Sequence, residues 1–182
     1  MRAEWLRRRF DADIVWLPFD LHPEYPAEGL PREQLLARYG ERGVGMTATR
    51  FAEEGLEYNP NPDVVPNTMN ALRLTELARD LGRHEDFHNH LMDAYWRDGV
   101  DIGNPDELRR LAADLPADDV ERVLAGGEYR DRVVASTREA QSVGINGIPA
   151  FLLDSRLLVL GAHPEETFER AFAQLADRDA GG

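Results

Sequence analysis

The positions of the strand-like segments constrain the fold of this chain more than any other feature of its sequence. Short apolar runs of the kind that form β-strands occur at 13–19, near the start, and at 150–153 and 157–160, near the end. Elsewhere apolar residues recur with the spacing of amphipathic helices. This order predicts an α/β protein whose small sheet is divided by a large all-helical insertion. We expect helices over the ranges 4–10, 31–39, 47–54, 67–80, 85–97, 105–113, 117–124, 128–142 and from Pro164 onward.

The first strand-like run is apolar on both of its alternating faces, which is typical of a strand covered on both sides. Asp154 and Ser155 separate the two later runs and favour a turn, so we expect a hairpin there. Three strands make a poor sheet, and proteins normally pair or cover an exposed apolar edge. The sequence therefore predicts a core that lacks a strand.

Composition excludes several classes of partner and chemistry. The chain has 182 residues, 42% of them hydrophobic, which suits one domain or one core with an insertion. Its net charge of −13 argues against nucleic acid and anionic membranes as partners. No apolar run approaches the roughly 18 residues of a membrane span, and no signal peptide is recognisable, so we expect a cytoplasmic location. The chain contains no cysteine, which excludes dithiol chemistry by this chain alone.

The histidines are the next candidates for a functional site. His84, His88 and His90 lie close together, and His84 and His88 have the i,i+4 spacing that metal sites can use. We interpret this group as a solvated polar helix face and expect neither a metal nor another cofactor. His22 and His163 have no nucleophile beside them in the sequence, so we assign no catalytic residue.

A resemblance to one family extends over nearly the whole chain. The matching segments, which occur in family order, are Trp16–Pro23, Asn67–Thr68 with Ala71 and Leu74, Ala94–Trp96, Asp101–Gly103, Gly144–Pro149 with Phe151, and Gly161–Ala162. With these segments the chain resembles the DsbA-like thioredoxin-fold proteins, specifically the FrnE-type subgroup. The resemblance implies a thioredoxin-like core formed by residues 1–25 and 143–182. Residues 26–142 would then form the helical insertion and connecting helix.

The resemblance also implies a first strand followed by C-x-x-C at the N-terminus of the first helix, where the helix dipole lowers the pKa of a thiol. This chain begins inside that helix, so we expect an incomplete core without the first strand and without the dithiol. Two explanations stay open. Either the coding sequence begins further upstream, or the chain is a variant without redox chemistry.

For function, the resemblance implies a family of thiol–disulfide oxidoreductases and a cis peptide bond before Pro149. Such a bond would leave the backbone of Ile148 free to pair with an extended peptide or a thiol ligand. We therefore assign Gly147, Ile148 and Pro149 as candidate substrate-binding residues. Without cysteine, the chain is expected to be inactive alone.

Two other functions remain open. One is a glutathione-dependent isomerase of the 2-hydroxychromene-2-carboxylate type, which has a similar Gly-x-Pro approach to a strand, although Leu160–Pro164 differs from the Trp-Gly-x-Asp-Arg segment of that group. The other is a non-catalytic binding or assembly module. In that case a partner strand, for example from a second copy in a homodimer, would pair with residues 13–19.

Overall fold

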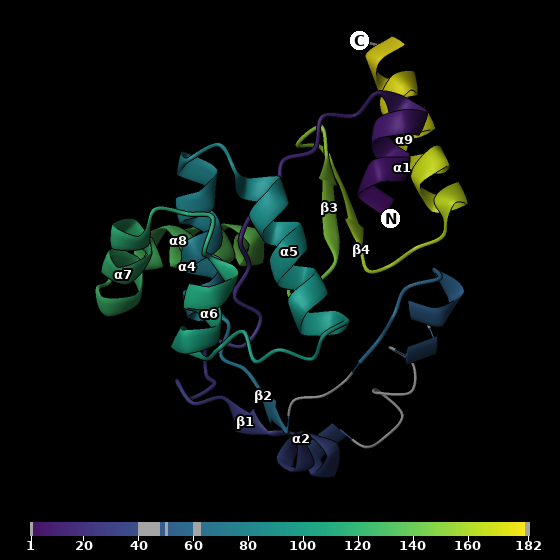
Figure 1. Cartoon of the computed structure of the whole chain (residues 1–182). Coiled ribbons are helices and arrows are strands. Elements are labelled where there is room, and N and C mark those ends of the chain that lie inside the picture. The colour runs from purple at the N-terminus through teal and green to yellow at the C-terminus, as the bar shows by residue number, and fades with distance from the viewer. Residues whose placement is uncertain (1, 40–47, 50, 60–62, 181–182) are drawn as a thin grey trace. The chain divides into compact units, whose positions relative to one another are not determined.

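The structure is a computed structural model that describes residues 2–39, 48–49, 51–59 and 63–180 (Figure 1). Its fold is mixed α/β with many helices and few strands, as the sequence predicts. The chain separates into two compact units, Met1–Ser136 and Thr137–Gly182. The core predicted from 1–25 and 143–182, with 26–142 as the insertion, stays a prediction.

The first unit is mainly helical, because its apolar residues recur at helical spacing. Both ends of every helix named below lie within two residues of the predicted ends. The helix predicted at 47–54 falls partly outside the described residues. Asn104 caps one of them, since its side chain accepts a hydrogen bond from the backbone N–H of Asp106 at 2.9 Å. The helices are α1 (Arg2–Phe10), α2 (Arg32–Tyr39), α4 (Met69–Asp80), α5 (His84–Trp96), α6 (Pro105–Leu111), α7 (Ala117–Ala125) and α8 (Arg130–Ser142), which continues into the second unit.

The core of the first unit lies among α4, α5, α6 and α7. α4 packs against both α5 and α7, and Leu74, Leu108 and Val123 are fully buried between these helices. Burying such a side chain contributes about 1.5–3 kcal/mol. None of the described helices is both long enough and apolar enough to cross a membrane.

A two-residue strand pair in the first unit was not predicted. β1 (Leu30–Pro31) and β2 (Val64–Val65) run antiparallel, with Leu30 opposite Val65. Gly29 precedes β1 with φ +77°, and a Cβ there would lie 2.6 Å from the carbonyl oxygen of Val65. Glycine is therefore required at this approach. Two residues are too few to produce a recognisable alternation, which is why the pair was missed.

The strand predicted at 13–19 is absent from the structure. Val15 and Leu17 are 69% and 72% exposed, so the expectation of a strand covered on both faces is wrong. A continuous apolar run gives a segment the capacity to form a buried strand, but a strand also needs a partner backbone. No strand among the described residues pairs with this segment.

Side chains take the place of a neighbouring strand along this segment. The guanidinium of Arg79 on α4 donates to the carbonyl oxygen of Trp16. The hydroxyl of Ser136 on α8 donates to the carbonyl oxygen of Pro18 at 2.8 Å. Side chains of α4 and α8 thus hold the backbone of this segment through two of its carbonyl groups, which lie two residues apart.

The second unit is a hairpin with one helix. β3 (Ala150–Leu153) and β4 (Leu157–Leu160) pair antiparallel with the predicted bounds (Figure 1). The predicted turn residues Asp154 and Ser155 both have positive φ, at 49° and 53°, a conformation that aspartate tolerates better than most residues.

The second unit is completed by α9 (Glu165–Ala180), which supplies its buried aromatic residue. Phe168 of α9 is fully buried, and the ring of Phe151 on β3 meets it edge to face, with centroids 4.9 Å apart. Such aromatic pairs contribute about 0.5–1.5 kcal/mol beyond their burial. This contact fixes β3, and with it the segment that leads into β3, against the helix.

Candidate functional site

The proline loop, defined as Gly144–Pro149, begins where α8 ends. The N–H of Gly144 donates to the carbonyl of Gln141 at 3.0 Å, and the N–H of Ile145 donates to that of Ala140 at 3.0 Å. These two bonds, with φ +92° at Gly144, form a Schellman motif, which satisfies the last carbonyls of the helix. The local sequence thus ends α8 and turns the chain toward β3.

The loop presents Ile148 at the surface. The Ile148–Pro149 peptide bond is cis, and the side chain of Ile148 is 59% exposed. The N–H of Gly161 donates to the carbonyl oxygen of Pro149 at 2.8 Å, so the pairing of β3 with β4 extends one residue beyond Ala150. Among the described residues, neither backbone group of Ile148 has a hydrogen-bond partner. Gly147 leaves space at the loop, because a Cβ there would meet no atom within 4 Å.

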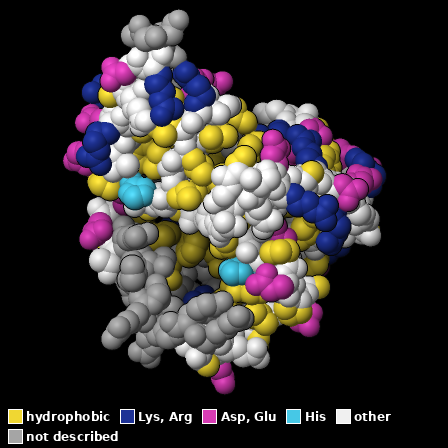
Figure 2. All heavy atoms as spheres, turned by 180° about the vertical axis from the view of Figure 1, so that it is seen from behind, with side chains coloured by type: hydrophobic (Ala, Val, Ile, Leu, Met, Phe, Trp, Pro, Cys, Tyr) yellow, Lys and Arg dark blue, Asp and Glu magenta, His cyan; other side chains and the backbone are white. Residues whose placement is uncertain are grey.

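Several apolar side chains that lie near this loop in sequence or in strand register are exposed. Val143, Leu152 and Leu160 are exposed together with Ile148, each by about half of its surface. Figure 2 shows hydrophobic side chains at the surface in the region of the hairpin. Exposed apolar groups beside a backbone that no described residue pairs suit an extended peptide better than a charged small molecule.

The histidines of α5 do not form the solvated face that we inferred from the sequence. His84 and His88 are partly buried, and their rings lie parallel with centroids 5.7 Å apart, whereas His90 is exposed. His88 also stacks on Trp16 at 5.1 Å. Burial is the main cause that lowers the pKa of His88, and burial with the nearby Arg79 lowers the pKa of His84 to about 4. Both rings are therefore neutral near pH 7.

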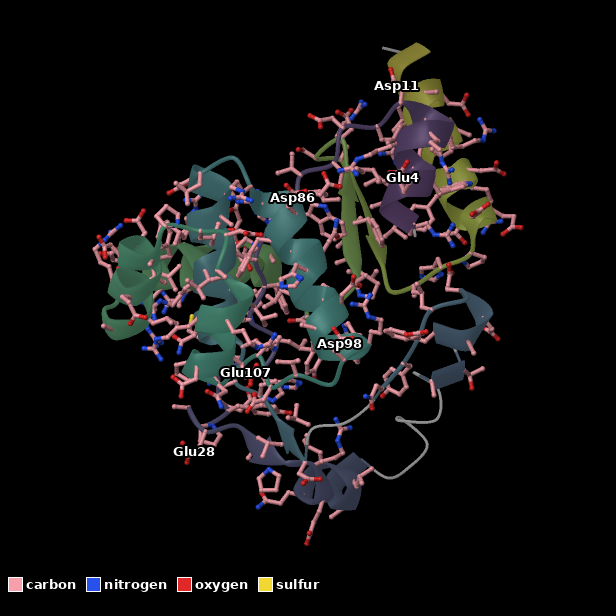
Figure 3. All side chains as sticks on the ribbon, in the orientation of Figure 1. Glu4, Asp11, Glu28, Asp86, Asp98 and Glu107 are labelled. Atoms are coloured by element: carbon pink, nitrogen blue, oxygen red, sulfur yellow. The ribbon has the colours of Figure 1, made fainter. Side chains whose placement is uncertain are left out.

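Among the described residues, carboxylates do not join these histidines to form a metal site. Figure 3 shows Asp86 near the start of α5 and Asp98 just beyond its end, with Glu107 further away on α6. Asp98 and Glu107 pair with arginines close to them in sequence, at 2.9 and 2.7 Å. No group of three potential ligands suited to a metal ion occurs in the described part of the chain.

Two segments that carry the resemblance meet in the first unit. The side chain of Asn67 donates to the carbonyl of Tyr25 at 2.7 Å, and the Tyr25 ring stacks on His22 with centroids 4.4 Å apart. Asp20, in the same segment, is 5% exposed, and burial raises the pKa of its carboxyl group. Asn67 thus ties the start of α4 to the turn that follows Asp20.

The first unit also contains a surface pocket of about 200 Å³ beside Asn67 and Gly103. Two of its polar side chains already have partners, since Asn67 bonds to Tyr25 and to the N–H of Met69, and Asp101 accepts from the N–H of Gly103. We therefore place the candidate site at the proline loop and not at this pocket.

The comparison with protein families agrees with the fold. The model of the DSBA-like thioredoxin domain matches residues 2–173, and the chain belongs to this family. The family is one of thiol–disulfide oxidoreductases.

A Bacillus protein and a Streptomyces protein are among those similar to the chain. The uncharacterized protein YwbO of Bacillus subtilis is 23% identical over 168 residues, which cover 90% of this chain and 82% of YwbO. The crystal structure of a probable DsbA oxidoreductase, SCO1869 of Streptomyces coelicolor, matches with a TM-score of 0.81 and 31% identity. That match covers 92% of this chain and 76% of the Streptomyces protein.

The three residues predicted as substrate-binding, Gly147, Ile148 and Pro149, are consecutive and lie on the proline loop, and their role in binding stays a prediction. Sequence reasoning missed Arg79 and Ser136, which hold the segment 13–19. These two donors lie 63 and 118 residues from their acceptors, and no local pattern predicts such a contact.

Proposed function

We propose that this chain binds an extended peptide or a thiol ligand at the proline loop, and that the chain alone does not catalyse thiol–disulfide exchange. Ile148 is exposed beside the end of the β3–β4 ladder, and its backbone has no hydrogen-bond partner in the described part of the chain, which supports the binding. A ligand strand can add main-chain hydrogen bonds at such a position. Exchange needs a thiolate to attack a disulfide, and the 182 residues contain no cysteine.

The binding is tested with two fluorescein-labelled peptides of the same apolar sequence, one with a single reduced cysteine and one with serine in its place. Fluorescence anisotropy gives the Kd, and amide shifts in NMR spectra locate the contact. We expect Ile148→Ala to weaken binding at least five-fold. Leu81→Ala, which removes another exposed apolar side chain in the first unit, is the control and should leave the Kd unchanged.

The two peptides separate the two ligand classes. Equal affinity indicates recognition of extended backbone, and tighter binding of the cysteine peptide indicates recognition of a thiol. No binding by either peptide at millimolar concentration, or shifts that do not include Ile148, would contradict the proposal.

The catalytic half is tested by insulin reduction with dithiothreitol. We expect the rate with the chain to equal the rate without it, and thiol-dependent turnover would refute this. Glutathione is the probe for the isomerase alternative. A rise in Tm with millimolar glutathione, lost in Ile148→Ala, would favour that class over peptide binding.

The FrnE-type assignment, the cytoplasmic location and the homodimer belong to the same proposal. The full set of matching segments, which runs in family order from Trp16–Pro23 to Gly161–Ala162, supports the first of these. Cell fractionation tests the location. Light scattering after gel filtration tests the dimer, which requires a mass near twice 20.6 kDa.

A further inference from the structure

His163 lies in the short connection between β4 and α9, and its ring is tied back to the end of β4. Its Nε2 atom lies 2.8 Å from the carbonyl oxygen of Leu160. A carbonyl oxygen can only accept, so Nε2 carries the hydrogen and donates it. The imidazole therefore closes the turn formed by Leu160 to His163.

Gly161 is the residue inside this turn that reaches the proline loop. Its N–H donates to the carbonyl oxygen of Pro149 at 2.8 Å, and its φ is +92°, in the region that glycine adopts without a steric penalty. The direction of this N–H depends on the conformation of the turn. An interaction that holds the turn in one conformation therefore also holds the carbonyl group of Pro149 in place, and Pro149 directly follows Ile148.

We propose that His163 is a positioning residue for the proline loop. By holding the carbonyl of Leu160, its ring fixes the turn from which Gly161 anchors Pro149, and so keeps the backbone of Ile148 in the orientation that a ligand strand requires. The ligand side of this inference rests on the proposed function. The anchoring side is measurable without any ligand.

Two amide side chains provide a matched test, because each imitates one ring nitrogen. In His163→Gln the amide nitrogen is as many bonds from Cα as Nε2, so it can donate to Leu160. In His163→Asn the amide nitrogen corresponds to Nδ1 and falls short of that oxygen. His90→Asn, at an exposed histidine of α5, controls for the loss of a surface imidazole.

The first readout is hydrogen exchange of the Gly161 amide by NMR, and the second is the Kd for the serine peptide. We expect His163→Asn to accelerate exchange at Gly161 at least ten-fold and to weaken peptide binding at least five-fold. His163→Gln should restore both values, and His90→Asn should change neither. A residue that only stabilised the fold would change Tm in both His163 variants without this pattern of rescue.

Each half can fail separately. Unchanged exchange at Gly161 in His163→Asn overturns the inference whatever the peptide does. Faster exchange with an unchanged Kd overturns the positioning role. If the wild-type chain binds no peptide, the proposed function fails and the ligand side fails with it, while exchange at Gly161 still decides whether His163 holds the anchor.

Discussion

Arg73 is the buried side chain whose replacement gives the sharpest test of how the first unit is held together. It lies on α4 and is 2% exposed, and its guanidinium donates to the carbonyl oxygens of Val123, Gly126 and Glu128. These carbonyls lie at and just beyond the C-terminal end of α7, where helix geometry leaves them without partners. One arginine thus joins α4 to the end of α7.

The cost of Arg73→Met follows from what happens to these acceptors. An unpaired buried carbonyl costs about 1–3 kcal/mol. The hydrogen bond to Val123 is buried, so its loss has the full cost of an unpaired carbonyl. The other two hydrogen bonds are only partly buried, so water can hydrogen-bond to those carbonyls and reduce the cost. Methionine fills similar space and removes a buried cation whose pKa burial already lowers, which offsets part of the loss. We expect the free energy of unfolding to fall by about 3 kcal/mol.

The measurement is urea denaturation followed by circular dichroism, with the free energy of unfolding obtained by linear extrapolation. Arg110→Met on α6 is the matched control, because Arg110 is exposed and its pair with Glu107 at 2.7 Å should contribute little. A loss below about 0.5 kcal/mol for Arg73→Met, with an unchanged m value, would refute the reasoning that Arg73 satisfies buried carbonyls.

Two further predictions concern pH and close packing. Burial and the nearby Arg79 lower the pKa of His84 from 6.5 to about 4, so the unfolded chain binds more protons between these values. The free energy of unfolding should therefore fall as pH falls from 6.5 toward 4, and less steeply in His84→Gln, as urea titrations across that range would measure. Gly103→Ala would place a Cβ 2.9 Å from that of Pro66 and should cost about 1–3 kcal/mol, whereas Gly127→Ala, with no atom within 4 Å, is the control for the same assay.

The elements that sequence reasoning predicted well are those defined by local patterns. Local patterns predict the apolar face of α4 and the start of α6 at Asn104–Pro105, because helical periodicity and capping depend on residues only a few positions apart. The hairpin β3–β4 was predicted with the observed bounds, since two apolar runs flank a turn pair.

What could not be predicted depends on residues far apart in sequence. The segment 13–19 is a continuous apolar run typical of a strand, yet two of its carbonyls bond to Arg79 and Ser136, and no local pattern reveals those donors. The same limit applies to His84 and His88, whose helical spacing was visible but whose burial against Trp16 was not. Burial depends on tertiary packing. In the structure, the two histidines that we expected to be solvated are stacked, partly buried rings, and burial keeps them neutral.

The sequence was enough to assign the residues of the candidate site, but it did not reveal the contacts that anchor them. Resemblance to a family pointed to Ile148 and Pro149, whereas the anchoring of Pro149 by Gly161 depends on how β4 pairs beyond its last residue. The sequence places His163 at a helix start and says nothing about where its ring points.

The contacts that shape the proline loop all lie within the second unit. α8 ends through Gly144, Phe151 packs on Phe168, and Gly161 anchors Pro149, so the end of α8, the hairpin and α9 together position the loop. Thiol exchange makes a different demand, because it needs a thiolate held beside that loop, and none of the 182 residues supplies one. In the function proposed above, recognition of an extended ligand is therefore independent of any redox step. Binding and exchange should be separable in this protein, and the peptide and insulin experiments measure them one at a time.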